Sequence, residues 1–213
     1  MNGSMASRLD TPADPREPWS SLPEAGLDLL FRAARSHKVW LPGPVADSLL
    51  RDMVELMQFG PTSTNSLPAR FVFVRTAEGK ERLGPALHAA NVPRMMQAPV
   101  TAIIGHDLAF HQHQQRLFPH RDVAAEYRAD PEHARTTAMR NGTLQGAYLM
   151  LAARALGLDC GPMSGFHNEI VDTAFFAGTS VRSNFLCNLG YGDAAMLPPR
   201  LPRLAFDDVC TFA

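Results

Sequence analysis

The chain has 213 residues, of which 46% are hydrophobic, enough for one sizeable core or at most two small ones. Twenty Lys and Arg residues against 21 Asp and Glu residues give a formal net charge of -1, which excludes a global attraction to nucleic acid or to anionic membranes. No apolar run approaches the roughly 20 residues that a membrane span requires. Three cysteines without a CxxC pair are typical of a protein of the reducing cytoplasm.

Residues 1–24 are rich in proline, serine and charged residues and contain no apolar signal core. We expect them to form a flexible arm outside the fold. No Gly/Ser-rich linker divides the chain after this point, which predicts a single domain over residues 25–213.

Hydrophobic periodicity predicts a mixture of helices and strands. The predicted helices cover residues 25–34, 44–59, 80–90, 133–156 and 168–176, and the predicted strands cover 71–74, 100–105 and 185–190. We expect residues 106–130 to be irregular, residues 160–166 to form a tight Gly/Pro loop, and the tail at 198–213 to end in a short amphipathic element. The elements follow no strict βαβ order, so the sequence predicts an α+β fold with helices flanking one sheet.

Two basic segments are candidates for phosphate binding. Arg35-Ser36-His37-Lys38, at the end of the first predicted helix, combines cations with a hydroxyl, as a phosphate monoester requires. The alternative is an ordinary basic turn that complements the helix dipole. Near the other end of the chain, Arg200 and Arg203 stand between prolines, where phosphate binding and a surface ion pair are equally compatible with the sequence.

Two polar loops are candidates for contact with a flat cofactor. Pro61-Thr62-Ser63-Thr64-Asn65 presents hydroxyls and an amide on a backbone stiffened by prolines, although a solvated turn has the same composition. In Gly161-Pro162-Met163-Ser164-Gly165-Phe166, the N–H groups of Ser164 and Gly165 could point at an electron-rich acceptor. A simple helix-to-helix connection is the alternative for this second loop.

A histidine-rich tract and three absent motifs limit the metal-binding, nucleophilic and nucleotide-binding sites that the sequence can form. The tract contains His106, His111, His113 and His120, but it has no HExxH pattern and no nearby cysteine, so we expect no metal site. The sequence also lacks GxSxG, GxxxxGK[ST] and GxGxxG motifs. A nicotinamide cofactor, if one is used, would therefore visit a shared site without a Rossmann domain.

Taken in order, these segments resemble the nitroreductase family of FMN-dependent oxidoreductases, and the resemblance covers nearly all of residues 27–209. Its motifs here are Arg35-Ser36-His37-Lys38, residues 61–68, Leu156-Gly157-Leu158 leading to Gly165-Phe166, Gly190-Tyr191, and Pro202-Arg203. Within the family, residues 60–63, 75–83, 161–166 and 200–204 are most similar to the malonic semialdehyde reductases of pyrimidine degradation. Two departures are Thr62, in place of a common serine, and Leu67, in place of a common glutamine.

The resemblance implies a nitroreductase-like fold with a central mixed sheet and an intertwined homodimer that binds two FMN molecules at its interface. It implies that Arg35, Ser36 and Lys38, with Arg203 and Arg200, hold the phosphate and ribityl end. The partner chain would supply the segment that contains Pro61, Thr62, Ser63 and Asn65, while Met163, Ser164 and Gly165 would lie near the flavin N5. No side chain is assigned as catalytic, because FMN carries the hydride.

The implied reaction is ping-pong hydride transfer from NADPH or NADH to FMN and then to a small aldehyde, converting malonic semialdehyde to 3-hydroxypropanoate. Arg121, Arg128 and Arg140 are candidates for binding the substrate carboxylate. One alternative is a broad reductase of nitroaromatics, quinones or enones with the same fold. Others are a flavin-binding module without turnover and a zinc hydrolase that uses the histidine tract.

Overall fold

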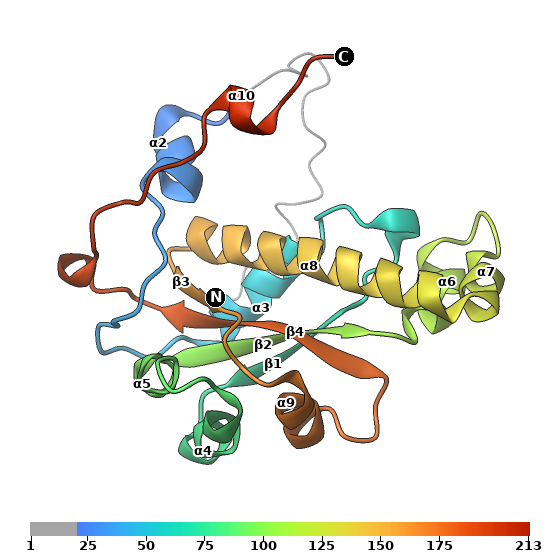
Figure 1. The fold of residues 1–213 in the computed structure, drawn as a ribbon, viewed down its shortest axis with the longest axis horizontal. Helices are drawn as coiled ribbons and strands as arrows, with labels where there is room; N and C mark the ends of the chain where they lie inside the picture. Colours follow the sequence, from blue (N-terminus) through green and yellow to red (C-terminus); the bar gives the residue numbers. More distant parts are fainter. Residues whose placement is uncertain (1–20) are drawn as a thin grey trace, which may run out of the picture.

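The computed structural model describes residues 21–213, so the expectation of an arm at residues 1–24 falls almost entirely outside the described residues. These residues form a four-stranded sheet with helices on both faces (Figure 1), which confirms the predicted α+β class. The prediction of a single domain over residues 25–213 stays a prediction.

The strands are β1 (Ala69–Val74), β2 (Val100–Asp107), β3 (Asp159–Met163) and β4 (Val181–Gly190), in the spatial order β1-β2-β4-β3. The prediction of a mixed sheet was wrong for the described residues, because all three strand pairings are antiparallel. Val74 at the end of β1 pairs with Thr101 near the start of β2. The helices between these two strands therefore bring the chain back to the end of the sheet where β1 finished.

Helices cover the sheet in two layers. On one face lie α3 (Asp47–Met57) and α8 (Pro131–Ala155), and on the other lie α4 (Ala77–Leu83), α5 (Val92–Gln97) and α9 (Asn168–Phe175) (Figure 1). The predicted irregular segment contains η4 (Phe110–His113), α6 (Gln114–Leu117) and α7 (Val123–Ala129), which pack together at the N-terminal end of α8. The shorter turns are η2 (Ser63–Asn65), η3 (Gly84–Ala86) and η5 (Ala194–Met196).

The predicted loop at residues 160–166 was wrong in its first half, which forms strand β3. Gly161 and Pro162 suggested a turn, but both pair with β4, opposite Asn188 and Cys187. Proline removes a hydrogen-bond donor and is tolerated in a strand mainly at the edge of a sheet. Because β3 is an edge strand of the sheet, Pro162 fits there.

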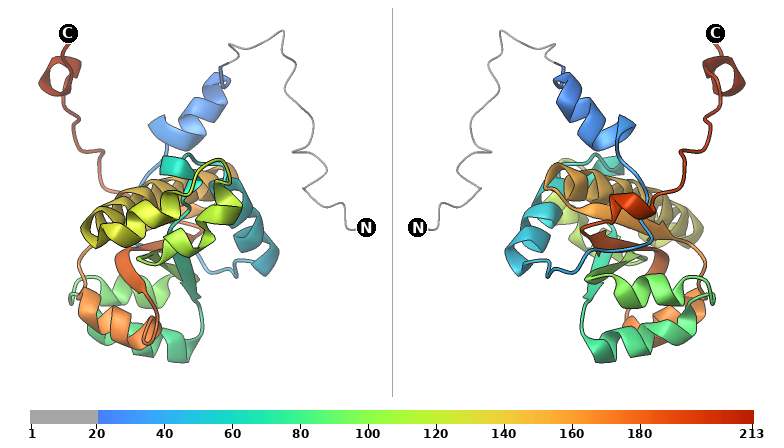
Figure 2. Two further views of the ribbon diagram at one scale, coloured as in Figure 1. Left: turned by 90° about the vertical axis from the view of Figure 1, so that its right-hand side faces the viewer. Right: turned by 90° about the vertical axis from the view of Figure 1, so that its left-hand side faces the viewer.

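The two ends of the described chain project from this body. The first predicted helix is short, with α2 (Glu24–Leu27) running into a π-helical turn, η1 (Asp28–Arg32). The tail carries α10 (Phe206–Val209), and all of residues 198–213 are exposed. Figure 2 shows both segments leaving the body on the same side as α8. Among the described residues, no helix has the length and apolar character needed to cross a membrane.

Helix α8 lies unusually close to the sheet at two glycines. A Cβ atom on Gly142 would lie 2.8 Å from the Cβ of His106 on β2, and one on Gly146 would lie 2.6 Å from the ring of Phe185 on β4. Real Cβ atoms do not approach so closely, so the packing requires glycine there although glycine weakens helices. The position of α8 is thus set by contact with two strands.

We expect Gly142→Val to lower the free energy of unfolding by about 2–3 kcal/mol, because the added atoms have no space beside His106. Denaturant titration followed by circular dichroism would measure this change. Arg140→Val on the exposed face of the same helix is the matched control and should change stability by about 0.5 kcal/mol or less. Equal stabilities of the two variants would contradict this account of the packing.

Candidate functional site

The first basic segment is fixed against the edge of the sheet. The N–H of His37 donates to the carbonyl of Cys160 at 2.9 Å, and Ser36 forms an isolated parallel bridge with the same residue of β3. The buried His37 side chain also approaches Asp159, with Nε2 3.4 Å from a carboxylate oxygen. These contacts hold Ser36 and His37 beside β3, and with them the flanking cations Arg35 and Lys38.

The basic tail is attached to the same place. Arg200 donates from Nη2 to the carbonyls of Arg32 and Ala34, at 2.6 and 2.9 Å. Arg35 donates in return to the carbonyl of Pro198, at 2.5 Å. Two segments from opposite ends of the described chain are therefore joined by arginine–carbonyl hydrogen bonds. From the sequence, this proximity could be expected only through the family resemblance.

Together these segments line a pocket of about 380 Å³. Among the described residues, five cationic side chains and no carboxylate line it: Arg35, Lys38, Arg154, Arg200 and Arg203, with Ser36 beside them. Such a concentration of like charge without counter-charge favours an anion as the ligand. The predicted convergence of the two basic segments is thus present within one chain.

Arg154 is a pocket residue that the sequence reasoning missed. It stands in the last turn of α8 and donates to the carbonyl of Leu30, while its Nε is buried without a partner among the described residues. A basic residue at the end of a helix normally complements the helix dipole, so the sequence alone gave no reason to single out Arg154. An unpartnered buried donor in an anion pocket is instead a candidate ligand contact.

The second part of the site follows β3 beyond the bridge to Ser36. Ser164 lies four residues after Cys160, which corresponds to roughly 13 Å along an extended strand. The carbonyl of Gly165 accepts hydrogen bonds from His88 N and Asn91 Nδ2, both at 3.0 Å. The N–H groups of Ser164 and Gly165 donate to no atom of the described residues. Two free donors therefore follow directly after the strand that holds the basic segment, roughly 13 Å along it from Cys160.

The sequence analysis also missed a polar pair beside these donors. Arg94 on α5 donates to the side-chain oxygen of Asn91, which in turn donates to Gly165. This chain of hydrogen bonds brings a cation close to the free N–H groups. The signal in the sequence was Asn91-Val92-Pro93, which places an amide directly before a helix whose second residue is proline.

The loop with Pro61, Thr62, Ser63 and Asn65 does not join the pocket within one chain. The Ser63 N–H donates to Asn141 on α8 at 2.8 Å, whereas the pocket residue Arg154 lies 13 positions further along the same helix. At 1.5 Å per residue this is a separation of roughly 20 Å. That the loop reaches a cofactor held by a partner chain stays a prediction.

The histidine tract is spread over the second strand and the segment after it. His106 is buried on β2, and His111 and His113 lie in η4. Across residues 21–213 no cluster of three or more His, Cys, Asp or Glu side chains has the arrangement of a metal site.

Comparison with known proteins places this geometry in a family. Residues 31–191 match the model of the nitroreductase family. The chain belongs to the nitroreductase family. A relative from Burkholderia lata, provisionally named NADH dehydrogenase/NAD(P)H nitroreductase, is 57% identical over 190 residues, covering 89% of this chain and 97% of the relative.

Solved structures of other nitroreductase-like proteins share the fold. One from Exiguobacterium sibiricum, in complex with FMN, has a TM-score of 0.78 at 18% identity and covers 91% of this chain and 100% of its own. CLA-ER, an enone reductase of gut-bacterial fatty acid saturation, has a TM-score of 0.77 at 19% identity, with coverages of 90% and 99%. The predicted nitroreductase-like fold is confirmed by these matches.

We expect Arg203→Met to weaken binding of inorganic phosphate by roughly three- to tenfold without destabilising the nitroreductase fold. Within residues 21–213 its guanidinium donates only to the neighbouring carbonyls of Leu201 and Pro202, so stability should change by about 0.5 kcal/mol or less. Phosphate titration monitored by phosphorus NMR would measure the affinity. Arg51→Met, at an exposed arginine of α3 in a different pocket, is the control, and an equal loss of affinity in both variants would argue against the site.

Proposed function

We propose that this protein binds FMN and uses it to transfer hydride from NADPH or NADH to a small electrophilic substrate. The observation that carries the proposal is the pocket of five cations without a carboxylate, continued along β3 by two free N–H donors. FMN matches these two parts of the site, because it has a dianionic phosphate at one end and an electron-accepting ring at the other. The FMN in the related structure supports this choice of anion.

At the phosphate end, Arg35, Lys38 and Arg203 would supply charge, and the Ser36 hydroxyl would supply a directional hydrogen bond. Arg200 would act partly through structure, because its guanidinium already fastens the tail to the carbonyls of Arg32 and Ala34. Arg154 would complete the pocket through its unpartnered Nε.

At the ring end, the chain's role is to orient a flat group and to complement negative charge. When bound, FMN would supply the redox chemistry by accepting hydride at N5 and passing it on. Met163, at the end of β3, would pack near the ring, and the N–H groups of Ser164 and Gly165 would face its electron-rich atoms. The Arg94–Asn91 pair would add positive charge beside them, favouring a reduced anion.

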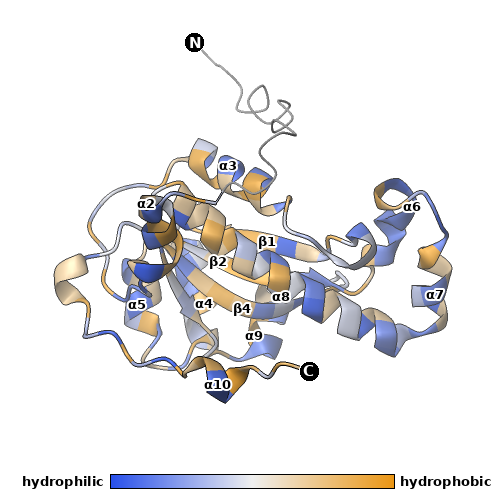
Figure 3. Ribbon diagram, turned by 90° about the horizontal axis from the view of Figure 1, so that it is seen from above, coloured by the Kyte–Doolittle hydropathy of each residue, from blue (hydrophilic) through white to orange (hydrophobic). Residues whose placement is uncertain are grey.

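We further propose that the active form is a homodimer. The outward face of α8 carries an apolar stripe, with Leu144 45% and Tyr148 37% exposed, together with Ala147 and the half-buried Leu151. Figure 3 looks down on α8 and shows hydrophobic residues in the middle of the helix and hydrophilic ones towards α7. The exposed tail adds more apolar surface: Leu201, Leu204, Phe206, Val209 and Phe212. A second copy of the chain would cover these surfaces.

For the substrate, we propose malonic semialdehyde, reduced to 3-hydroxypropanoate in the cytoplasm. Three of the four segments that resemble malonic semialdehyde reductases, residues 60–63, 161–166 and 200–204, belong to the candidate site, and the fourth, residues 75–83, lies mostly in α4. A carboxylate on the substrate would need a cation. Arg121 and Arg128 face Glu126 and Asp122, at 3.5 and 4.0 Å, whereas Arg140 makes no ion pair among the described residues. Arg140 also adjoins Asn141, which holds the Ser63 loop, so we favour it for this role.

Stopped-flow spectroscopy of the FMN-loaded protein would test the proposed reaction. We expect NADPH or NADH to bleach the flavin absorbance and malonic semialdehyde to restore it under anaerobic conditions. Arg140→Met should raise KM for this aldehyde roughly tenfold, the effect of one lost charged hydrogen bond, and leave KM for an uncharged aldehyde unchanged.

The other outcomes separate the alternatives. Reoxidation by quinones, nitroaromatics or enones but by no aldehyde would indicate a broad reductase, as the enone reductase with the same fold illustrates. Bound FMN that NADPH and NADH do not reduce would indicate a flavin-binding module. Failure of the wild-type protein to take up FMN would overturn the proposal.

The dimer has a test of its own. Leu144→Lys should convert the protein to a monomer and lower its FMN content, because it places a charge on the apolar stripe of α8. Ile170→Lys introduces the same charge at a similarly exposed position of α9, on the other side of the sheet, and should stay dimeric. Light scattering after size-exclusion chromatography measures the mass. A monomeric wild type that binds FMN fully would contradict the dimer.

A further inference from the structure

The η2 turn and the residues just after it have an unusual backbone. Thr64 (φ 48°), Asn65 (φ 50°) and Leu67 (φ 41°) all lie in the left-handed region, although none is glycine. Residues with a Cβ avoid this region, and a turn persists there only when surrounding contacts determine it. The contacts that hold η2 are therefore as important as its own sequence.

Two buried side chains contact Thr64 at the centre of the turn: Gln114, and Tyr127, whose hydroxyl lies 3.3 Å from the Thr64 hydroxyl. Gln114, the first residue of α6, is 1% exposed. Its Nε2 donates both to the carbonyl of Thr64, at 2.8 Å, and to the Thr64 hydroxyl, at 3.0 Å. The flanks are held differently, since Ser63 N donates to Asn141 and Asn65 Nδ2 donates to the carbonyl of Leu117.

The other half of the Gln114 amide is not used. Its Oε1 is buried and has no hydrogen-bond partner among the described residues. An unpaired buried acceptor is unfavourable, and the two hydrogen bonds that Nε2 donates to Thr64 offset this cost. The buried amide is therefore explained by its donor, which pairs the Thr64 carbonyl.

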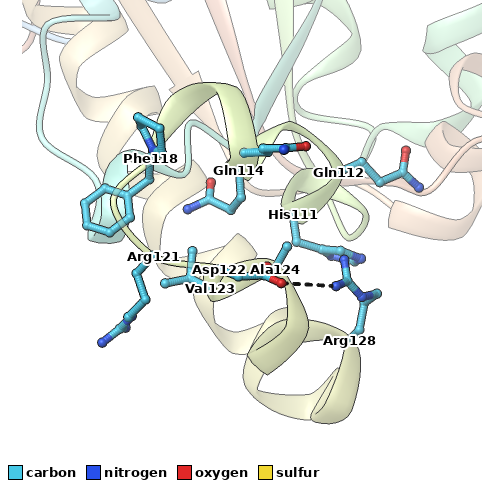
Figure 4. A pocket seen from close by; sticks show the side chains of 11 residues that line it. His111, Gln112, Gln114, Phe118, Arg121, Asp122, Val123, Ala124 and Arg128 are labelled. Carbon is cyan, nitrogen blue, oxygen red and sulfur yellow. Dashed lines mark ion pairs between the residues drawn. The ribbon is translucent and has the colours of Figure 1, made fainter.

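Gln114 also lines a pocket of about 370 Å³ between α6 and α7. Figure 4 shows it there with Phe118, His111 and the Asp122–Arg128 ion pair. Burial and the Arg128 cation hold the pKa of His111 below its ordinary value. Gln114 thus connects this pocket to the turn that carries Ser63 and Asn65.

We infer that Gln114 is a positioning residue for the cofactor. By holding Thr64, it would direct the Ser63 hydroxyl and the Asn65 side-chain oxygen, which make no hydrogen bond among the described residues, towards FMN held by a partner chain. This inference rests on the proposed function. Gln114 itself does not touch FMN in this account. Its donor fixes a strained turn, and the shape of the turn determines the contact.

Gln114→Met is the first test, because methionine is similar in length and lacks the donor and the unpaired acceptor. We expect its FMN dissociation constant to rise about tenfold, as for the loss of one hydrogen bond of ordinary strength. Hydrogen exchange of residues 62–67 in the FMN-free protein should become faster. Gln115→Met is the matched control, since Gln115 is exposed, lines the same pocket and makes no side-chain hydrogen bond among the described residues; neither quantity should change.

Gln114→Glu gives a readout that a purely structural role would not produce. A protonated carboxyl can donate to the Thr64 carbonyl, whereas a carboxylate would repel it. Burial at this position would raise the pKa of the introduced carboxyl above its ordinary value. The ratio of variant to wild-type FMN affinity should therefore rise towards one as the pH falls to 5 and fall about tenfold or more by pH 8. The other titratable groups that line the pocket, His111, Arg121, Asp122 and Arg128, are the same in both proteins, so the ratio isolates residue 114.

Faster exchange and weaker FMN binding in Gln114→Met, with a pH-dependent ratio in Gln114→Glu, would support the inference. Unchanged exchange, or faster exchange with an FMN affinity within twofold of wild type, would overturn it, as would a ratio that is flat with pH. If Gln114→Met does not fold, the pH profile of Gln114→Glu decides. A wild-type protein that takes up no FMN, with exchange still dependent on residue 114, would refute the proposed function and show only that Gln114 holds the turn.

Discussion

The close contact between α8 and the sheet is the constraint on which the rest of the structure depends. Gly142 and Gly146 allow the helix to lie directly on β2 and β4. The amides between and beside them then reach backbone groups of the opposite edge, with Asn141 accepting from Ser63 N and Gln145 accepting from Ala69 N, both at 2.8 Å. A helix displaced outward by even one methyl group would lose these bonds. The packing of α8 against the sheet therefore also fixes the position of the polar loop.

The sheet edge formed by β3 fixes the positions of two other segments of the candidate site. Backbone pairing with Cys160 fixes the basic segment at Ser36, and the same strand carries Met163 to the loop at Ser164 and Gly165. Charge at one end and free N–H groups at the other are thus held at a fixed separation by a strand that is itself paired to β4. Hydrogen bonds from Arg35 and Arg200 to backbone carbonyls then attach the tail to the basic segment. The third polar segment stands at the other edge of the sheet, before β1, so within one chain it lies apart from the cationic pocket.

Much of this could be predicted from the sequence, and the exceptions have physical reasons. Residues 133–156 were predicted as a long helix because their apolar spacing and Gly157 are strong local signals, and α8 covers 131–155. β3 was missed because Gly161 and Pro162 are turn residues in isolation, whereas an edge strand tolerates them. Arg154 and Asn91 were missed because their roles arise only when distant segments meet. The Thr62–Asn65 loop was recognised by composition, but composition does not show that Gln114, 50 residues away, determines its shape.

The length of α8 has a consequence for how such a chain can diverge. Each residue advances a helix by about 1.5 Å and turns it by about 100°. A single insertion between Asn141 and Arg154 would swing the arginine out of its pocket while the asparagine stayed in place, or the reverse. Homologues of this chain should therefore keep the same number of residues between these two positions.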